Sequence, residues 1–272
     1  MLKTVTVTGA DDSVKPVDLA AVAAEYPFVE FGILFRGSKN RVRVREGDPP
    51  EPNRPRFPSF DWMVELLCEV EPKARLNLSC HLCGQAARDF LEGVYLGGPK
   101  ARDFQEGVYL GGPQPINTHF RRCQVNTHGV PHDFDVRRLR ETVRQMTMNG
   151  QQAVFQYDRV NTDAMLSCVG RHVHDEYESL DLNIAALYDL SHGAGVLPEE
   201  WDHPLAGTTI PCGFAGGLSP DNVAGQIEKI LPVVGETPFW IDAETHLRSD
   251  GDRQFDLAKV RRFLEAAKPY VK

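Results

Sequence analysis

Short runs of apolar and β-branched residues recur along the whole chain, and stretches with apolar residues at helical spacing separate them. This alternation is typical of repeated strand–helix units around a parallel sheet. The runs are apolar on both faces, which suits strands covered by helices on the outside and by core on the inside. Eight strands are expected, at Thr4–Thr8, Val29–Phe35, Arg75–Cys80, Arg122–Thr127, Ala153–Tyr157, Ile184–Asp189, Thr209–Phe214 and Phe239–Ala243.

The helix patterns are clearest where Ser or Asp precedes the apolar positions, because these residues cap helix N-termini. Such helices are expected at Ser59–Val70, Asp135–Met146 and Asp256–Tyr270, and another follows the Asp221-Asn222 pair. With 272 residues the chain is near the usual size of one closed (β/α)8 barrel. We therefore predict an α/β fold in a single domain over residues 1–272, a closed eight-stranded parallel TIM barrel. An open parallel sheet is the alternative.

Two segments depart from a minimal barrel. Residues 36–58 are rich in Arg, Gly and Pro and are expected to form a long loop after the second strand, of the kind that lies over an active site. Residues 87–100 are repeated as residues 101–114, with differences only at positions 91/105 and 100/114. Two copies are too few to stack as a solenoid. We interpret the repeat as a duplication on the outside of the barrel that leaves the strand count unchanged.

Composition narrows the partner and the compartment. A formal net charge of -8 argues against nucleic acid and anionic membranes, and it leaves a small molecule as the expected partner. No apolar run is long enough to span a membrane and the polar start lacks the centre of a signal peptide, so a cytoplasmic location is expected. Six cysteines are scattered through the expected elements, and buried thiols without a structural disulfide are their expected state.

The last third of the chain holds the most informative motifs. Asp189-Leu-Ser-His-Gly-Ala-Gly195 follows one apolar strand, and Phe214-Ala-Gly-Gly-Leu-Ser-Pro-Asp-Asn-Val223 follows the next. After the final strand comes Ile241-Asp-Ala-Glu-Thr-His-Leu-Arg248. A Gly-Gly pair between a strand and a helix exposes backbone N–H groups. Gly216 and Gly217 are therefore expected to bind phosphate in a late barrel loop, although such a pair is about as often only a turn.

In order and spacing, these three segments resemble phosphoribosylanthranilate isomerase, a barrel family that performs an Amadori rearrangement on a phosphorylated aminosugar in tryptophan synthesis. Residues 215–223 are similar to that family's phosphate-loop signature, and Asp189 with its Gly-rich sequel is similar to its catalytic-acid motif. Residues 5–9 and 31–35 resemble its first two strands. The resemblance implies an isomerase of the intramolecular oxidoreductase type with Asp189 as the acid.

The sequence departs from that family at two places. The family's general base is a cysteine at the end of the first strand, and Thr8 takes that position here. A threonine hydroxyl cannot act as an unassisted base near neutral pH, because it ionises far above a thiol. Glu244 and His246 stand where the family has small residues around the phosphate. A carboxylate there repels phosphate unless it is turned away or protonated.

Other polar residues fall at expected strand ends. His81 follows the third strand and His128 closes the fourth, and with Asp189 and Glu244 they offer acid and base groups or a mixed His/carboxylate metal site. Each one alone is more often a hydrogen-bonded structural residue. The candidate catalytic residues are Asp189, Thr8, Glu244, His81 and His128. The candidate residues for binding the substrate or its phosphate are Gly216, Gly217, Arg41, His192 and His246.

Some chemistry is disfavoured by the sequence. Cys80 and Cys83 have redox or zinc-site spacing, but no second cysteine pair accompanies them, so ordinary thiols are favoured there. Neither a metal nor a cofactor is expected. No lysine falls at an expected strand end and no Gly-x-Ser-x-Gly motif occurs, which argues against Schiff-base and seryl hydrolase chemistry. Arg41 lies in a basic loop that either holds a substrate carboxylate or is only solvated.

Three functions remain open at this point. The first is a phosphoribosylanthranilate isomerase-like enzyme that isomerises a small sugar or amino-sugar, with or without a phosphate group, by proton transfer with Asp189 as the acid. The second is a barrel that binds a metabolite or a metal without turnover. The third is a genuine phosphoribosylanthranilate isomerase of tryptophan biosynthesis with a substituted base. The first is favoured, because barrels of this kind are mostly enzymes although the fold does not fix the reaction.

Overall fold

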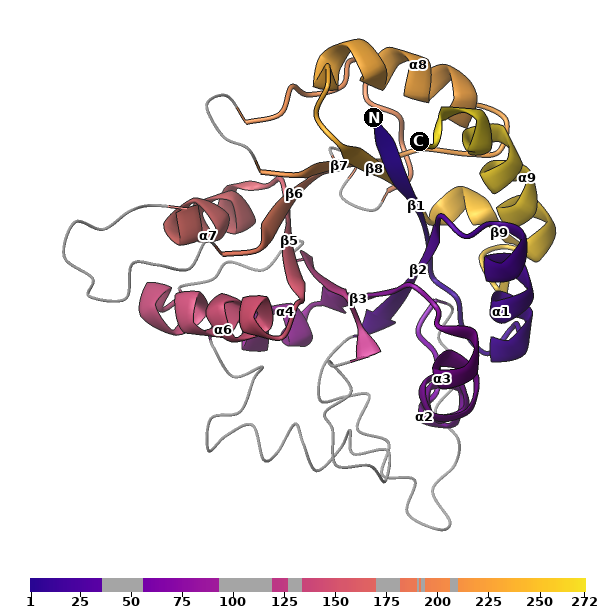
Figure 1. The fold of residues 1–272 in the computed structure, drawn as a ribbon, viewed down its shortest axis with the longest axis horizontal. Coiled ribbons are helices and arrows are strands. Elements are labelled where there is room, and N and C mark those ends of the chain that lie inside the picture. The colour runs from indigo at the N-terminus through magenta and orange to yellow at the C-terminus, as the bar shows by residue number, and fades with distance from the viewer. Residues whose placement is uncertain are drawn as a thin grey trace.

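The computed structural model is a closed barrel of eight parallel strands that pair in chain order (Figure 1). It describes residues 1–35, 56–92, 119–126, 134–169, 182–189, 191, 194–205 and 210–272. The pairing of the first strand with the eighth closes the barrel, so the predicted fold class is confirmed. The strands are β1 (Leu2–Thr8), β2 (Val29–Phe35), β3 (Leu78–Cys83), β4 (Arg122–Asn126), β5 (Gln152–Gln156), β6 (Ile184–Asp189), β7 (Cys212–Ala215) and β8 (Phe239–Ala243).

Helices form a layer around the strands (Figure 1). The capping residues predicted for three of them are confirmed: the Ser59 side chain accepts from the Trp62 N–H, and Asp135 and Asp256 each accept from two backbone N–H groups. Between α2 and α3 the chain forms a π-helical turn at residues 65–70. The helices are α1 (Pro16–Glu25), α2 (Phe60–Val64), α3 (Glu71–Ala74), α4 (Gln85–Leu91), α6 (Val136–Met148), α7 (Arg159–Val169), α8 (Val223–Val234) and α9 (Leu257–Ala267).

The predicted bounds of the third strand are wrong by three residues. Arg75 has φ 53°, a left-handed conformation that ends α3, and β3 begins only at Leu78. His81 therefore lies inside the strand and not after it. The expectation of buried thiols is also wrong in part, because Cys68 is exposed and Cys83 is only half-buried. None of the six cysteines, all within described residues, forms a disulfide.

Only part of the two unusual segments falls within the described residues. Residues 87–91 of the first repeat copy lie in α4, where Phe90 is buried and packs edge-on against Phe155 at 6.3 Å between ring centroids. Residues 93–114 of the repeat and residues 36–55 of the expected loop lie outside the described residues. Within the described part of the chain, no helix is both long enough and apolar enough to cross a membrane.

The interior of the barrel holds both apolar and polar side chains. Alternate residues of each strand point inward, and those of β5 to β8 include a small apolar cluster of Val154, Ala185, Leu187, Ala215 and Trp240. The inward positions of β1 to β4 hold buried polar side chains, among them Thr6, Thr8, Glu30, Ser79, His81 and Gln124. Buried polar groups need partners, so this interior imposes a network of hydrogen bonds and ion pairs.

Near the N-terminal ends of the strands, that network depends on Arg122. Its guanidinium makes an ion pair with Glu30 and donates to the Thr6 hydroxyl at 2.9 Å. It also stacks over the Trp240 ring, 4.3 Å from the centroid. The indole fits because Gly213 on the neighbouring strand has no side chain: a Cβ there would lie 2.0 Å from Trp240 Cε2.

We expect Gly213→Ala to lower the free energy of unfolding by about 1–3 kcal/mol, because the methyl group overlaps the indole and forces it to move. Gly225→Ala in α8 is the matched control, because a Cβ there meets no atom within 4 Å. The control should raise the free energy of unfolding by about 0.5–1 kcal/mol, since alanine favours a helix over glycine. Urea denaturation followed by circular dichroism measures both. Equal stability of the two variants would show that the indole is not confined as described.

Candidate active site

A cavity of about 150 Å³ lies at the C-terminal ends of the strands. Residues from the ends of six strands line it: Leu34, Cys83, Asn126, Asp189, Ala215 and Asp242. Its rim is formed by residues of the loops after β6, β7 and β8. This end of a (β/α)8 barrel is where catalytic side chains converge, because the strands are parallel and their carboxyl ends meet.

Asp189 is held in one orientation by hydrogen bonds to both of its oxygens. Oδ1 accepts from the Ser191 backbone N–H at 3.1 Å and from the Ser191 hydroxyl at 2.7 Å. Oδ2 accepts from Gln156 Nε2 at 2.8 Å, and both side chains are buried. Gly216 stands close to this carboxylate, since a Cβ at Gly216 would lie 3.3 Å from Oδ1. Asp189 is therefore fixed as a hydrogen-bond acceptor at the cavity wall.

Asp242 is a second carboxyl group in the same cavity. It lies on β8, is 6% exposed, and Oδ1 accepts a hydrogen bond from the Thr8 hydroxyl at 2.7 Å. Burial raises the pKa of Asp242 to about 8, against the opposing effect of the Thr8 hydrogen bond and with the charge of Glu244 adding to the rise. At neutral pH, Asp242 is therefore mainly a carboxylic acid that can donate a proton.

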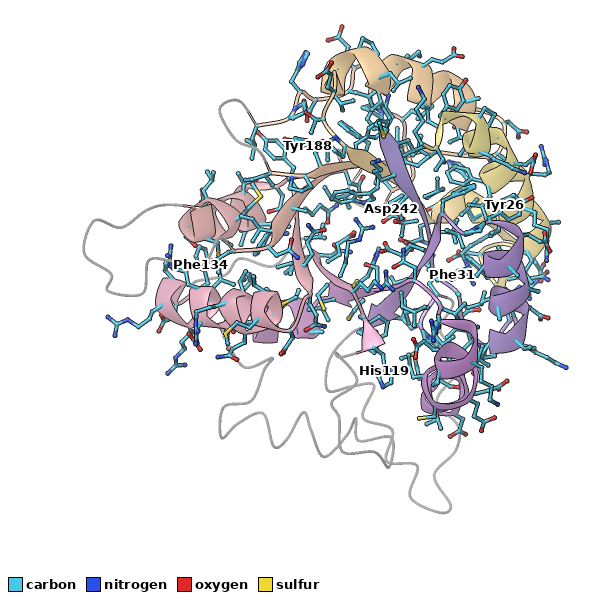
Figure 2. All side chains as sticks on the ribbon, viewed as in Figure 1. Tyr26, Phe31, His119, Phe134, Tyr188 and Asp242 are labelled. Carbon is cyan, nitrogen blue, oxygen red and sulfur yellow. The ribbon has the colours of Figure 1, made fainter. Side chains whose placement is uncertain are left out.

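The two carboxyl groups face the cavity from either side of Ala215. Asp189 pairs with Ala215 in the register of β6 and β7, and Ala215 pairs with Asp242 in the register of β7 and β8. Two strand spacings separate their Cα atoms by about 10 Å. The small Ala215 side chain leaves the space between them open, and Figure 2 shows Asp242 inside the ring of strands. A small molecule in this space would contact both groups.

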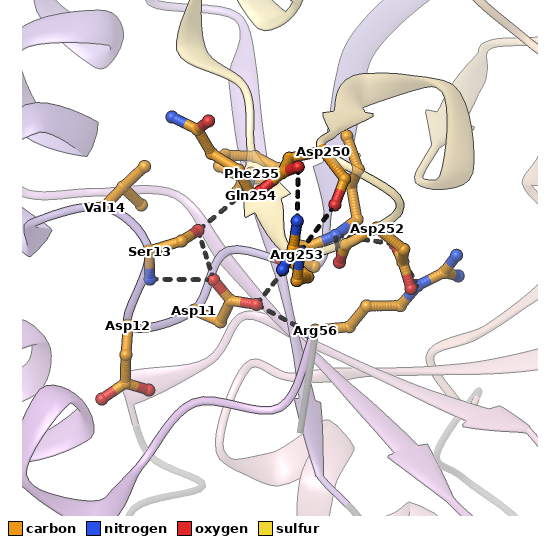
Figure 3. A network of polar contacts seen from close by, with 12 residues as sticks. Asp11, Asp12, Ser13, Val14, Arg56, Asp250, Asp252, Arg253, Gln254 and Phe255 are labelled. Carbon is orange, nitrogen blue, oxygen red and sulfur yellow. Dashed lines mark hydrogen bonds and ion pairs between the residues drawn. The ribbon is translucent and has the colours of Figure 1, made fainter. Parts of the chain in front are cut away.

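The rim beside β8 is held by an ion-pair network between loops (Figure 3). Arg56 contacts Glu244 at 2.6 Å and Asp252 at 2.9 Å, and its backbone N–H donates to Asp11 at 2.7 Å. Asp11 in turn pairs with the buried Arg248 at 2.7 Å. Burial raises the pKa of Glu244, and the charge of Arg56 opposes that rise. Glu244 thus lines the cavity as one member of an ion pair.

The loops after β6, β7 and β8 pack closely at the rim of the cavity. Gly216 has φ 108° and Gly217 has φ 65°, so both adopt conformations that side chains rarely allow. A Cβ at Gly217 would lie 2.3 Å from Leu197 N, which shows how closely the β6 loop approaches. His246 bonds through Nε2 to the Gly195 carbonyl at 2.9 Å. Gly216, Gly217 and His246 all line the cavity, as required of residues that bind a substrate there.

Thr8 and His81 lie deeper in the barrel and are not part of the cavity wall among the described residues. Both approach Gly32, where a Cβ would lie 2.2 Å from Thr8 Oγ1 and 2.8 Å from His81 Nε2. Burial, with a contribution from Arg122, lowers the pKa of His81 to about 3, so its imidazole is neutral. Nε2 of His81 is buried without a hydrogen-bond partner in the described structure. Thr8 touches the cavity indirectly, through its hydrogen bond to Asp242.

Three of the candidate residues, Arg41, His128 and His192, lie outside the described residues. Within the part of the chain that is described, no group of three or more His, Cys, Asp or Glu side chains is placed to hold a metal ion. Asp189, Glu244 and His81 therefore do not form a metal site by themselves.

Asp242 and Arg56 were missed in the sequence. The signal for Asp242 was present in Phe239-Trp-Ile-Asp-Ala243. Trp240 and Asp242 alternate there with three apolar residues, so both share the inward face, and Asp242 is the one nearer the C-terminal end of the strand. Arg56 comes from a loop without periodicity, and nothing in its neighbourhood indicates that it would reach Glu244.

No family model matches the sequence, and no curated protein matches it. The fold is similar to the crystal structure of phosphoribosyl anthranilate isomerase from Thermus thermophilus, with a TM-score of 0.52, 12% identity, and coverage of 98% of this chain and 99% of that chain. A BexX/CysO complex from Amycolatopsis orientalis has a TM-score of 0.43, 14% identity, and coverage of 98% and 88%. A D-tagatose 3-epimerase-like protein has a TM-score of 0.41, 11% identity, and coverage of 99% and 100%. The likeness to the isomerase extends to the barrel fold alone.

The raised pKa of Asp242 predicts how stability depends on pH. The pKa is about 8 in the folded protein against an ordinary 3.8, so the unfolded chain releases this proton first. The contribution of Asp242 to stability is therefore fully present below about pH 4 and is lost as pH rises through about 8. Asp242→Asn removes this titration and keeps an acceptor for Thr8. We expect the unmodified protein to lose more unfolding free energy than Asp242→Asn between about pH 5 and pH 8.5.

The matched control for this measurement is Asp163→Asn, because Asp163 is an exposed residue of α7. Its pH dependence should follow that of the unmodified protein. If Asp242→Asn also follows it, the carboxyl group of Asp242 is not held protonated.

Proposed function

We propose that the chain is a barrel enzyme that isomerises a small, uncharged, polyhydroxylated carbonyl compound, such as a sugar, by proton transfer between Asp242, the substrate and Asp189. The proposal rests on one observation above all. A buried carboxyl group with a pKa of about 8 and a second, fully hydrogen-bonded carboxyl group face one small cavity. Two carboxyl groups whose environments differ are the usual basis for separate acid and base roles.

Asp242 suits the role of proton donor. A catalytic acid works best when its pKa lies near the working pH, and about 8 meets that condition. The Thr8 hydroxyl donates to Oδ1, so the proton of the carboxylic acid is left for Oδ2. Once the proton has moved to the substrate, the same hydrogen bond stabilises the carboxylate that remains.

Asp189 suits the role of proton acceptor. In this assignment it takes the proton from the carbon beside the substrate carbonyl while Asp242 donates a proton to the carbonyl oxygen, which gives an enediol. Asp242 then recovers a proton from the neighbouring hydroxyl as the new carbonyl forms, and Asp189 returns its proton to the adjacent carbon. Both groups end in their starting state and the substrate is isomerised without net oxidation. Asp189 thus acts as an acid, the role expected for it from the sequence, in the second half of this cycle, when it returns its proton to carbon.

The cavity lining favours an uncharged substrate. Among the described residues that line it, Asp189, Asp242 and Glu244 are carboxyl groups, and Arg56 is paired with Glu244. A dianionic phosphate would meet Asp189 and Glu244 without a free cation from the described wall, which disfavours it. Asn126 and Gln124 offer amide donors and acceptors, and such groups bind the hydroxyls of a polyol.

The test is deuterium exchange. The purified protein is incubated in D₂O with neutral aldoses and ketoses and, in parallel, with their phosphate esters, and NMR follows exchange at the carbon beside the carbonyl. We expect exchange and isomerisation of at least one neutral sugar. Asp189→Asn should lower the rate at least about hundredfold, because it removes the acceptor, whereas Asp163→Asn should leave it unchanged. Absence of exchange from every sugar would favour a barrel that binds without turnover, whereas full activity of Asp189→Asn would show that Asp189 is not the proton acceptor.

The pH profile gives a second prediction. Because Asp242 must be protonated to donate, the rate should fall as pH rises through about 8. Thr8→Val removes a hydrogen bond that favours the charged form, so it should raise the pKa of Asp242 and move the alkaline limb to higher pH. The pH dependence of kcat in both proteins measures this. An unchanged or lowered alkaline limb in Thr8→Val would show that Asp242 is not the group that titrates.

A further inference from the structure

A second cavity, of about 340 Å³, lies at the opposite mouth of the barrel. Its lining comes from the first residues of several strands, including Lys3 of β1, Arg122 of β4 and Gln152 of β5, and from residues that directly precede a strand, such as Pro238. It is therefore at the N-terminal ends of the strands, the full height of the barrel away from the candidate active site. Asp242, Asp189 and the glycine loops take no part in it.

This mouth concentrates positive charge on an acidic protein. Lys3, Arg121 and Arg122 line the cavity together with one carboxylate, Glu30, although the chain as a whole carries a formal charge of -8. Glu30 is already neutralised by its ion pair with Arg122. The Arg121 side chain is exposed, and no carboxylate of the described chain forms an ion pair with it. The Lys3 ammonium group donates to the Lys272 backbone oxygen at 3.2 Å.

Arg122 is fixed in place by three other residues. Its Nε donates to Glu30 Oε2 at 2.9 Å, its Nη2 donates to Thr6 Oγ1 at 2.9 Å, and its plane stacks on Trp240. A guanidinium group held in this way loses little entropy when it meets a ligand, so it forms a rigid floor of the cavity.

Part of the remaining wall is apolar, beside the polar residues Thr4, Asn77 and Gln152. The exposed rings of Pro211 and Pro238 stand at the mouth, beside Phe239 and Trp240 at the start of β8. Flat rings pack well against proline rings and aromatic edges. A ligand that fits both halves of this wall carries a negative charge at one end and a flat apolar group at the other.

We propose that the N-terminal mouth of the barrel binds a small planar carboxylate, with its carboxylate between Arg121 and Lys3 and its ring against Pro211 and Pro238. Arg121 is the main contact, because no carboxylate of the described chain pairs with it and, unlike the Lys3 ammonium group, its guanidinium group can bind a carboxylate through two parallel hydrogen bonds. This proposal is independent of the reaction assigned to the other end of the barrel.

Isothermal titration with benzoate tests the site. We expect saturable binding with one ligand per chain, weakened at least about tenfold in Arg121→Gln, since a charge-assisted contact is lost. The control is Arg138→Gln, which makes the same change of charge at an exposed residue of α6 and should bind as the unmodified protein does. Both positions are at the surface, so both variants should fold. Absence of saturable binding, or an equal effect of the two substitutions, would overturn the proposal.

Two further titrations locate the ligand and test its flat part. Asp189→Asn changes only the C-terminal cavity, so it should leave benzoate binding unchanged, and a weakened affinity would place the ligand there and overturn the assignment. Acetate should bind more weakly than benzoate, because it lacks the ring that contacts the prolines. Equal affinities for acetate and benzoate would overturn the role given to the apolar wall.

Discussion

The pairing of β1 with β8 closes the barrel, and the candidate active site depends on it. Thr8 and Asp242 are 234 residues apart in the sequence, yet the closed register brings the hydroxyl within 2.7 Å of the carboxyl group. Closure also excludes water from the interior. Ionisation of Asp242 is therefore disfavoured by desolvation, and its pKa rises to about 8. In an open sheet the same residues would be separated and Asp242 would be an ordinary surface acid.

Buried ionisable groups in the barrel interior avoid an isolated charge in two different ways, one near the N-terminal ends of the strands and one near their C-terminal ends. Near the N-terminal ends of the strands, Arg122 and Glu30 remain charged and neutralise one another, and Trp240 packs against the guanidinium group. Near the C-terminal ends of the strands, no cation among the described residues forms an ion pair with Asp242, and this group stays protonated instead. A buried ionisable group either forms an ion pair or stays uncharged through a shifted pKa, because an isolated charge is too unfavourable in a dry interior. His81, in the middle of β3, also stays uncharged.

The sequence predicted the elements whose signals are local. The bounds of β2, β6 and β8 agree with the structure residue for residue, because each strand is a short apolar run between polar segments. The third strand was placed too early, since Arg75 and Asn77 carry no sign of the left-handed turn that precedes β3. Asp189 was found because a motif marks it.

The other half of the site had no such motif. Asp242 follows from strand alternation once β8 is taken as a barrel strand, but its raised pKa follows only from the three-dimensional burial. The Arg56–Glu244 pair joins a loop to a residue 188 positions further along the chain, and no spacing rule relates them. Thr8, expected at the position of a base, lies behind Asp242 and supports it through a hydrogen bond. The motifs of the resemblance thus lie at the cavity, and the pairing across the closed barrel supports the chemistry that we propose for it.

The most direct test of this account is the titration of the Asp242 carboxyl group itself. Carbon-13 NMR of protein labelled at the aspartate carboxyl carbons, with Asp242→Asn to assign the resonance, gives its pKa without any assumption about the substrate. The account predicts a carboxyl resonance that titrates near pH 8 and is missing from the variant. A resonance of Asp242 that titrates near pH 4 would mean that the group is ionised at neutral pH, and it would remove the proton donor on which the proposed reaction depends.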